Sequence, residues 1–166
     1  MRSSAHIEKD VVLAYHEAGH AVVAWRLSVP IYEVTVGPNG GSVRDKLGWR
    51  SLSPDWIGPD DREWARKTAL ILLGGEFAEK AYGFLNDCQT DCYGSDKDRT
   101  ELEEVIKGLF GGFTHAAVAW RECMEDQVDQ IVVDHWAEIA ALATALISEG
   151  YLSESRPREF GQGDKW

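Results

Sequence analysis

The 166-residue chain lacks the features that mark membrane, secreted and disulfide-rich proteins. No apolar run approaches the roughly 20 residues that a membrane-spanning helix needs. The first ten residues hold four charged side chains and no apolar stretch, so no signal peptide is visible. There are three cysteines, an odd number that does not suggest a disulfide framework. We therefore expect a cytoplasmic protein with no membrane span.

Positive charge is also scarce. Lysine and arginine number 17 against 28 acidic residues, which gives a formal net charge of −11. Such a surface repels phosphate backbones, so nucleic acid is not an expected partner. Length and a 44% hydrophobic content are typical of one domain with a sizeable core. We expect a single domain over residues 1–166, with its core at about 8–152 and a tail at 153–166.

Hydrophobic periodicity predicts a mainly helical domain (α+β) with a small N-terminal β-sheet. Apolar residues recur at helical spacing in four segments, residues 8–27, 59–82, 95–110 and 113–149. The last helix is expected to bend or split near 125–128 and to end at Gly150. Alternating residues predict a strand at 31–36 and one or two short polar strands within 42–52.

Two adjacent glycines, Gly74 and Gly75, lie inside the second expected helix. Each costs roughly 1 kcal/mol relative to alanine at a helix interior. Their presence predicts close packing of this helix against another element, such as the first helix.

The first helix carries the pattern His16-Glu17-Ala18-Gly19-His20. Two histidines four residues apart lie on one helix face, so that both rings can reach one metal ion. Glu17 lies beside them, where it can take a proton from water activated by the metal. The alternative is an amphipathic helix with two incidental histidines. The position inside the helix and the small neighbouring residues favour one catalytic Zn²⁺ held by His16 and His20, with Glu17 as the catalytic base.

A catalytic zinc ion needs a third protein ligand, which the motif itself does not supply. The extended pattern with a third histidine is absent, because Val23 and Arg26 occupy the relevant positions. The ligand must therefore come from farther along the chain. The residues alone leave eight candidates: Glu76, Glu79, Asp87, Cys88, Asp91, Cys92, Asp96 and Asp98.

The segment Ala14-Tyr15-His16-Glu17-Ala18-Gly19-His20-Ala21-Val22-Val23 resembles the protease-helix signature of the FtsH-type ATP-dependent zinc metalloproteases. Four further segments are similar to that family, namely residues 29–38, 73–79 (Leu-Gly-Gly-Glu-Phe-Ala-Glu), 94–98 and 135–152. The resemblance covers most of residues 10–155. It implies the helical zincin fold of the FtsH peptidase domain.

The same resemblance implies that Asp98 is the third zinc ligand, since it matches the aspartate that closes the family's Gly-Ala-Ser-Asn-Asp segment. In the alternative reading, Ser95 and Asp98 only cap a helix, and Asp96 would serve almost as well. Glu79 matches a family glutamate and is expected to orient a ligating histidine by accepting a hydrogen bond from its second ring N–H. Its alternative is a solvated helix carboxylate.

The chain also departs from the family. Glu76 stands where the family has arginine, and Lys80 stands where it has a second glutamate. Cys88 and Cys92 are additional; they could bind zinc or form a labile disulfide, and we favour plain loop thiols.

No Gly-x-x-x-x-Gly-Lys-[Ser/Thr] phosphate loop occurs in the sequence. We therefore expect a zinc metalloendopeptidase that cuts flexible or unfolded polypeptides without ATP of its own. A separate ATPase or homo-oligomer is a possible partner. The first alternative is a catalytically silent metal-binding regulatory module. A second is a zinc hydrolase of a small molecule.

Overall fold

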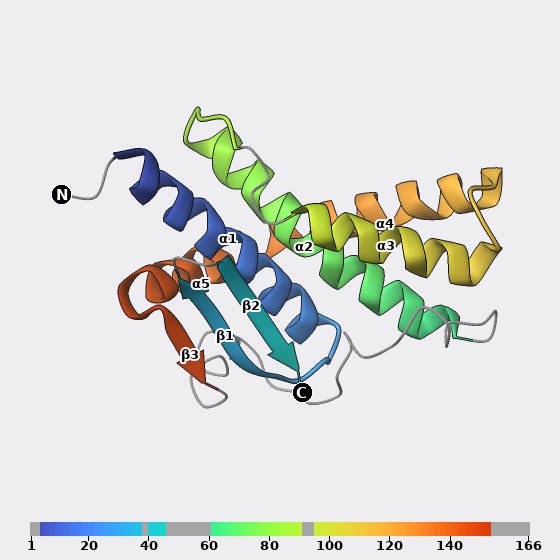
Figure 1. Cartoon of the computed structure of the whole chain (residues 1–166), viewed down its shortest axis with the longest axis horizontal. Coiled ribbons are helices and arrows are strands. Elements are labelled where there is room, and N and C mark those ends of the chain that lie inside the picture. The colour runs from blue at the N-terminus through green and yellow to red at the C-terminus, as the bar shows by residue number, and fades with distance from the viewer. Residues whose placement is uncertain (1–3, 38–39, 46–60, 91–94, 154–166) are drawn as a thin grey trace.

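The computed structural model describes residues 4–37, 40–45, 61–90 and 95–153. These residues form five helices and three strands, shown in Figure 1. In chain order they are α1 (Ser4–Arg26), β1 (Ile31–Gly37), β2 (Gly40–Asp45), α2 (Arg62–Leu85), α3 (Ser95–Phe110), α4 (His115–Asp134), α5 (Trp136–Glu149) and β3 (Tyr151–Ser153). The predicted mainly helical fold with a small sheet is confirmed.

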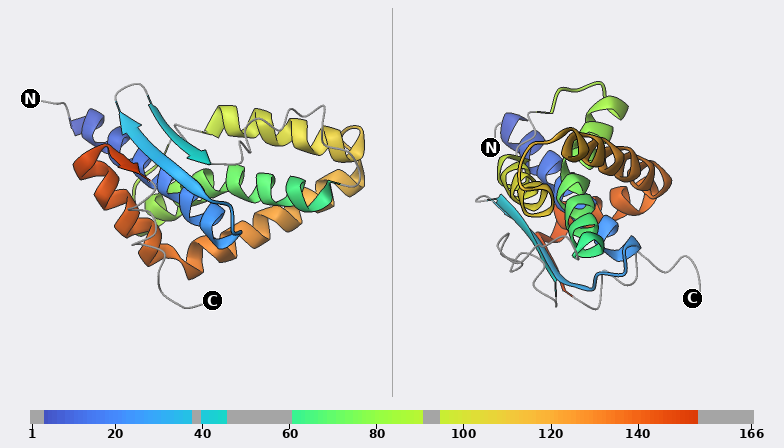
Figure 2. Two further views of the ribbon diagram at one scale, coloured as in Figure 1. Left: turned by 90° about the horizontal axis from the view of Figure 1, so that it is seen from below. Right: turned by 90° about the vertical axis from the view of Figure 1, so that its right-hand side faces the viewer.

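Helix α1 lies at the centre of the fold. It contacts α2, α4, α5 and the two longer strands, and Figure 2 shows it between the sheet and α5. Its inner residues are mostly small and fully buried, among them Ala14, Ala18, Ala21, Val22 and Val23. Small side chains on several faces let neighbours approach closely from more than one side, which explains how one helix can carry so many contacts.

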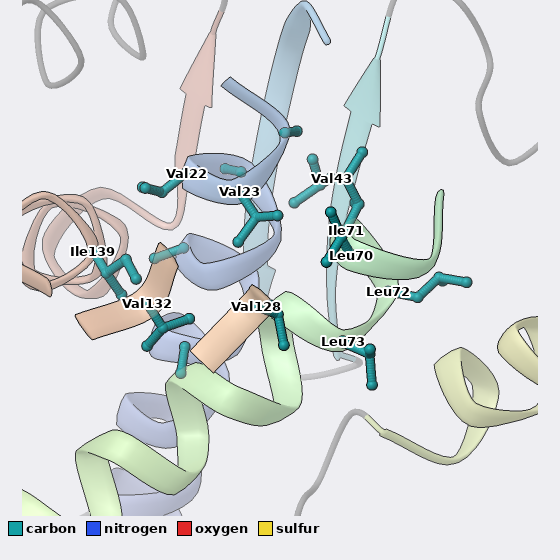
Figure 3. Close-up of a cluster of buried hydrophobic side chains, with 14 of the residues drawn as sticks. Val22, Val23, Val43, Leu70, Ile71, Leu72, Leu73, Val128, Val132 and Ile139 are labelled. Carbon is teal, nitrogen blue, oxygen red and sulfur yellow. The ribbon is translucent and has the colours of Figure 1, made fainter. Parts of the chain in front are cut away.

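The hydrophobic core draws side chains from α1, α2, α4, α5 and the sheet. Figure 3 shows part of this cluster, with Val22, Val23, Val43, Leu70, Ile71, Leu73, Val128, Val132 and Ile139 gathered around α1 and α2. Burial of these apolar surfaces is the main force that holds the helices on the sheet.

Helices α1 and α2 approach closely where both carry glycine. A Cβ atom built on Gly19 would lie 2.3 Å from the carbonyl oxygen of Gly74 and 2.6 Å from Cβ of Ala78. A Cβ on Gly74 would in turn lie 3.0 Å from the carbonyl oxygen of Gly19. The predicted packing of the double glycine against the first helix is therefore confirmed.

The sheet has the order β2-β1-β3, and both pairings are antiparallel. Val34 of β1 pairs with Val43 on one side and Leu152 on the other, and all three are buried. The third strand was not predicted, so the sheet is not purely N-terminal. Its three residues are too short to show alternation. Gly150 ends α5 as expected, with a φ of 71°, and turns the chain back onto β1.

The break in the last helical segment lies at His135, not near residues 125–128 as predicted. There α4 and α5 meet at a bend of 74°. Glu138 in the first turn of α5 accepts hydrogen bonds from His135, at 3.1 Å, and from Arg26 at the end of α1. These tertiary contacts hold the first turn of α5 against α1, and no local breaker residue in the sequence announces them.

Other boundaries shifted by a few residues. Helix α1 begins at Ser4, earlier than expected, and α2 begins at Arg62 and continues to Leu85. The predicted start of α2 at Pro59, and the part of the polar strand prediction beyond residue 45, fall outside the described residues.

No single helix among the described residues is long and apolar enough to cross a membrane. Helices α4 and α5 meet the length and composition test only when taken together, across their 74° bend.

We predict that Gly19→Ala destabilises the protein by about 1–3 kcal/mol, because the new methyl group would meet the backbone of Gly74. The loss should exceed the gain of roughly 1 kcal/mol that alanine brings inside a helix. Urea unfolding of the metal-free protein measures it. The matched control is Gly37→Ala, since a Cβ on Gly37 meets no atom of the described residues within 4 Å. Equal stability of the Gly19 variant and the wild type would contradict the close helix packing.

Candidate metal centre

His16 and His20 lie one turn apart on α1 and are 2% and 0% exposed. Their Nε2 atoms are 2.8 Å apart, and the two rings are nearly perpendicular. Oδ2 of Asp98, in the first turn of α3, lies 3.0 Å from Nε2 of His16 and 3.1 Å from Nε2 of His20. The structure thus brings together three residues that are far apart in sequence.

The opposite side of each imidazole ring is also held. Nδ1 of His16 lies 2.5 Å from Oε1 of Glu79, and Nδ1 of His20 donates to the carbonyl oxygen of Ile71 at 2.6 Å. A carbonyl or carboxylate oxygen can only accept here, so Nδ1 carries the proton in both rings. Both Nε2 atoms therefore face Asp98 with their lone pairs when the rings are neutral.

Three acceptor atoms facing one point repel one another unless a cation lies between them. The ligand atoms of His16, His20 and Asp98 all lie within 4.8 Å of one another. Tetrahedral zinc, with bonds of about 2.0–2.1 Å, needs ligand atoms about 3.3 Å apart. The observed separations of 2.8–3.1 Å are only slightly shorter. Two imidazoles and one carboxylate also match zinc in chemistry, so these residues fit the ion.

Electrostatics in the metal-free protein point the same way. Burial opposes the charge on His16, but hydrogen bonds to Asp98 and Glu79 and the nearby Glu17 outweigh it and raise the pKa of His16 to about 10. Burial also opposes the charge on Asp98, yet the two histidines outweigh it and hold the pKa of Asp98 well below its usual value. Without metal, a proton therefore supplies the positive charge that this centre requires.

Gly75 of α2 has no side chain, and the rings of His16 and His20 occupy the space where one would lie. A Cβ atom on Gly75 would lie 2.6 Å from Cε1 of His16 and 2.6 Å from Nε2 of His20. Sequence reasoning predicted close helix packing at this position but not its contact with the metal centre. The position of Gly75 four residues before Glu79, one helical turn away on the same face, was the available signal.

Glu79 is fully buried against His16, so the alternative of a solvated helix carboxylate is wrong. Asp98 is also buried, and its carboxylate contacts the histidines. Ser95, expected to cap α3, has a buried hydroxyl with no hydrogen-bond partner in the part of the chain that the structure describes. Glu17 is 4% exposed and lies against Gly41 of β2.

The other ligand candidates lie away from this cluster or outside the described residues. Asp87 and Asp96 are exposed, and Cys88 is half-buried and forms no disulfide with another described cysteine. Asp91 and Cys92 fall outside the described residues, so the predicted Cys88–Cys92 alternatives stay predictions.

Glu76 serves as a link between helices. Its carboxylate lies 2.7 Å from Nζ of Lys80 on α2 and 3.1 Å from Nε of Arg99 on α3. Burial opposes its charge, but hydrogen bonds from Arg99 and Lys80 outweigh this and lower the pKa of Glu76. The two departures from the family pattern, Glu76 and Lys80, thus pair with each other, and Glu76 joins α2 to α3 beside Asp98.

No protein-family model matches the chain. Among curated proteins, the ATP-dependent zinc metalloprotease FtsH 1 of Thermoanaerobacter sp. (strain X514) is 40% identical over 118 residues, covering 66% of this chain and 18% of that protein. The YME1 homolog of Schizosaccharomyces pombe, also named an ATP-dependent zinc metalloprotease, is 28% identical and covers 99% of this chain and 26% of its own length. FtsH of Helicobacter pylori (strain J99) is 30% identical, covering 72% of this chain and 18% of that protein. The chain spans about a fifth to a quarter of the length of these relatives.

We predict that Gly75→Ala weakens zinc binding by about 10- to 100-fold, because the methyl group would displace both ligating rings. Competition with a chelating dye measures the affinity, and circular dichroism checks that the variant is folded. Gly37→Ala, which adds a methyl group that contacts none of the described residues, should bind zinc like the wild type. A folded Gly75 variant with wild-type affinity would contradict the described packing.

We also predict that zinc binding releases about one proton near neutral pH, because the metal must displace the proton on His16, whose pKa is about 10. Affinity should then rise roughly tenfold per pH unit up to that value. In the metal-free protein, by contrast, the free energy of unfolding should fall as the pH rises. The stability that the charged ring contributes is complete below about pH 6.5 and is lost as the pH rises through about 10. Titration calorimetry in buffers of different ionisation enthalpy measures the proton count, and no release near pH 7.5 would contradict the raised pKa.

Proposed function

Because the chain is related over most of its length to the FtsH-type ATP-dependent zinc metalloproteases, we propose that it is a zinc-dependent endopeptidase. The observation that carries this proposal is the convergence of Nε2 of His16, Nε2 of His20 and Oδ2 of Asp98 on one point. Two buried imidazoles and a buried carboxylate from two helices can share one cation, and this donor set suits zinc.

In this proposal His16, His20 and Asp98 hold one zinc ion. The bound ion would polarise the peptide carbonyl and make water acidic enough to react at neutral pH. Glu79 and the carbonyl of Ile71 fix the orientation of the two rings through their Nδ1 atoms. Their role is to keep both Nε2 atoms aimed at the metal position.

Glu17 follows His16 directly on α1 and is close enough for its charge to be one of the causes that raise the pKa of His16. We assign it the proton transfers of the reaction. Its carboxylate accepts a proton from the attacking water and then donates that proton to the nitrogen of the departing amine. Both transfers need the carboxylate within hydrogen-bond reach of the reacting atoms.

Strand β2 is one of the two edge strands of the sheet within the described residues, and it lies against Glu17. An extended polypeptide can add to such an edge by main-chain hydrogen bonds, which require no particular sequence. We therefore propose flexible or unfolded polypeptide segments as the substrates. Folded proteins would first have to be unfolded, for example by an ATPase, before such segments could reach the edge strand.

We predict that Glu17→Gln binds zinc with wild-type stoichiometry while hydrolysis of an unfolded protein falls by at least about 100-fold, since the amide cannot accept the proton. Metal analysis and a fluorescence assay on a denatured protein substrate measure the two properties. Glu122→Gln, at an exposed position on α4, is the matched control and should leave both unchanged.

The possible results separate the proposed role of Glu17 from the proposed function. Undiminished hydrolysis by the Glu17 variant would remove the role assigned to Glu17. A wild-type protein that binds zinc but cleaves no unfolded polypeptide would instead indicate a metal-binding module without protease activity.

A further inference from the structure

Strand β2 lies directly on the side chain of Glu17. A Cβ atom built on Gly41 would lie 2.4 Å from Cγ of Glu17, 2.5 Å from Oε1 and 2.6 Å from Cδ. Real Cβ atoms essentially never approach another heavy atom this closely. Glu17 therefore occupies the space in which any other residue at position 41 would place its side chain.

The register of the sheet explains why position 41 faces Glu17. Gly41 pairs with Val36 of β1, and two residues later Val43 is buried in the core. Alternate residues of a strand share a face, so position 41 belongs to the same inward-facing row as Val43. That face packs on α1, which contacts β2.

Backbone conformation does not explain the glycine. The neighbouring Gly40 has a φ of 116°, which favours glycine, but Gly41 has no such positive φ. An alanine could adopt the backbone conformation at position 41. The requirement there is for space beside Glu17.

We propose that Gly41 is a positioning residue for Glu17. The Glu17 side chain packs directly against the backbone of Gly41. This contact holds Glu17 between α1 and β2, where the residue is 4% exposed. A methyl group at position 41 would push the carboxylate away from the metal position. The inference rests on the proposed function in assigning the proton transfers to Glu17.

The consequences differ from those at Gly75. Position 75 contacts the rings that hold the metal, whereas the atoms nearest to position 41 all belong to Glu17. Gly41→Ala should therefore keep the zinc affinity within about threefold of the wild type. It should lower kcat by at least about tenfold, with KM changed less than twofold, because an offset of about 1 Å in a catalytic group is costly.

A test independent of activity uses Glu17→Ala, which removes the side chain that a methyl group at position 41 would meet. Gly41→Ala should lower the melting temperature of the wild type by several degrees and leave that of Glu17→Ala unchanged. Gly37→Ala is the control in both backgrounds, because a Cβ there lies within 4 Å of no atom in the described part of the chain. It should change neither the melting temperature nor kcat.

The possible results distinguish the two proposals. An equal fall in melting temperature in both backgrounds, or loss of zinc by a folded Gly41→Ala, would overturn the role of Gly41. Wild-type kcat in that variant would overturn it as well. If the wild type hydrolyses no polypeptide, the proposed function fails, while the melting temperatures still decide whether Gly41 positions Glu17. If Gly41→Ala does not fold alone, recovery of folding in the Glu17→Ala background supports the proposal.

Discussion

The close approach of α1 and α2 is the constraint on which the metal centre depends. Gly19 and Gly74 let the two helix backbones come together, and Gly75 then leaves room for the rings of His16 and His20. The same approach brings Glu79 and the carbonyl of Ile71 within hydrogen-bond distance of Nδ1 of the two rings. Glycines that cost stability in an isolated helix are thus the reason that both imidazoles are oriented before any ligand binds.

The second requirement is a carboxylate from outside this helix pair, supplied by Asp98 on α3. The negative charge around the histidines favours a positive charge at this site, whether that charge is a proton or a metal ion. Without metal it raises the pKa of His16 to about 10, and with metal the same charges would stabilise the bound cation. Glu76 ties α3 to α2 through Arg99, one residue from Asp98. A partly exposed ion pair of this kind contributes only about 1 kcal/mol, so its main effect is to hold the first turn of α3 against α2.

Local patterns predicted the parts of the site that reside on one helix. The spacing of His16 and His20 places them on one face of α1, and the double glycine predicted close packing of α2 against another helix. Asp98 and Glu79 followed only from a family resemblance, since eight side chains were equal candidates on the residues alone. The bend at His135, strand β3 and the contact of Gly41 with Glu17 arise from tertiary packing. They leave no periodic signal, because each depends on a partner at least 20 residues away in the chain or on fewer than four residues of regular structure.

Strand β2 joins the two halves of the proposed reaction. Its inner face contacts Glu17 through Gly41, and its outer edge is unpaired with any other strand among the described residues. A polypeptide added to that edge would be held by main-chain hydrogen bonds in a fixed register relative to the backbone of Gly41. Strand β2 would then fix the position of the Glu17 carboxylate, which transfers the proton, relative to the peptide that receives it. This arrangement needs no side chain at position 41, which is why the smallest residue, rather than a more specific one, suits the position.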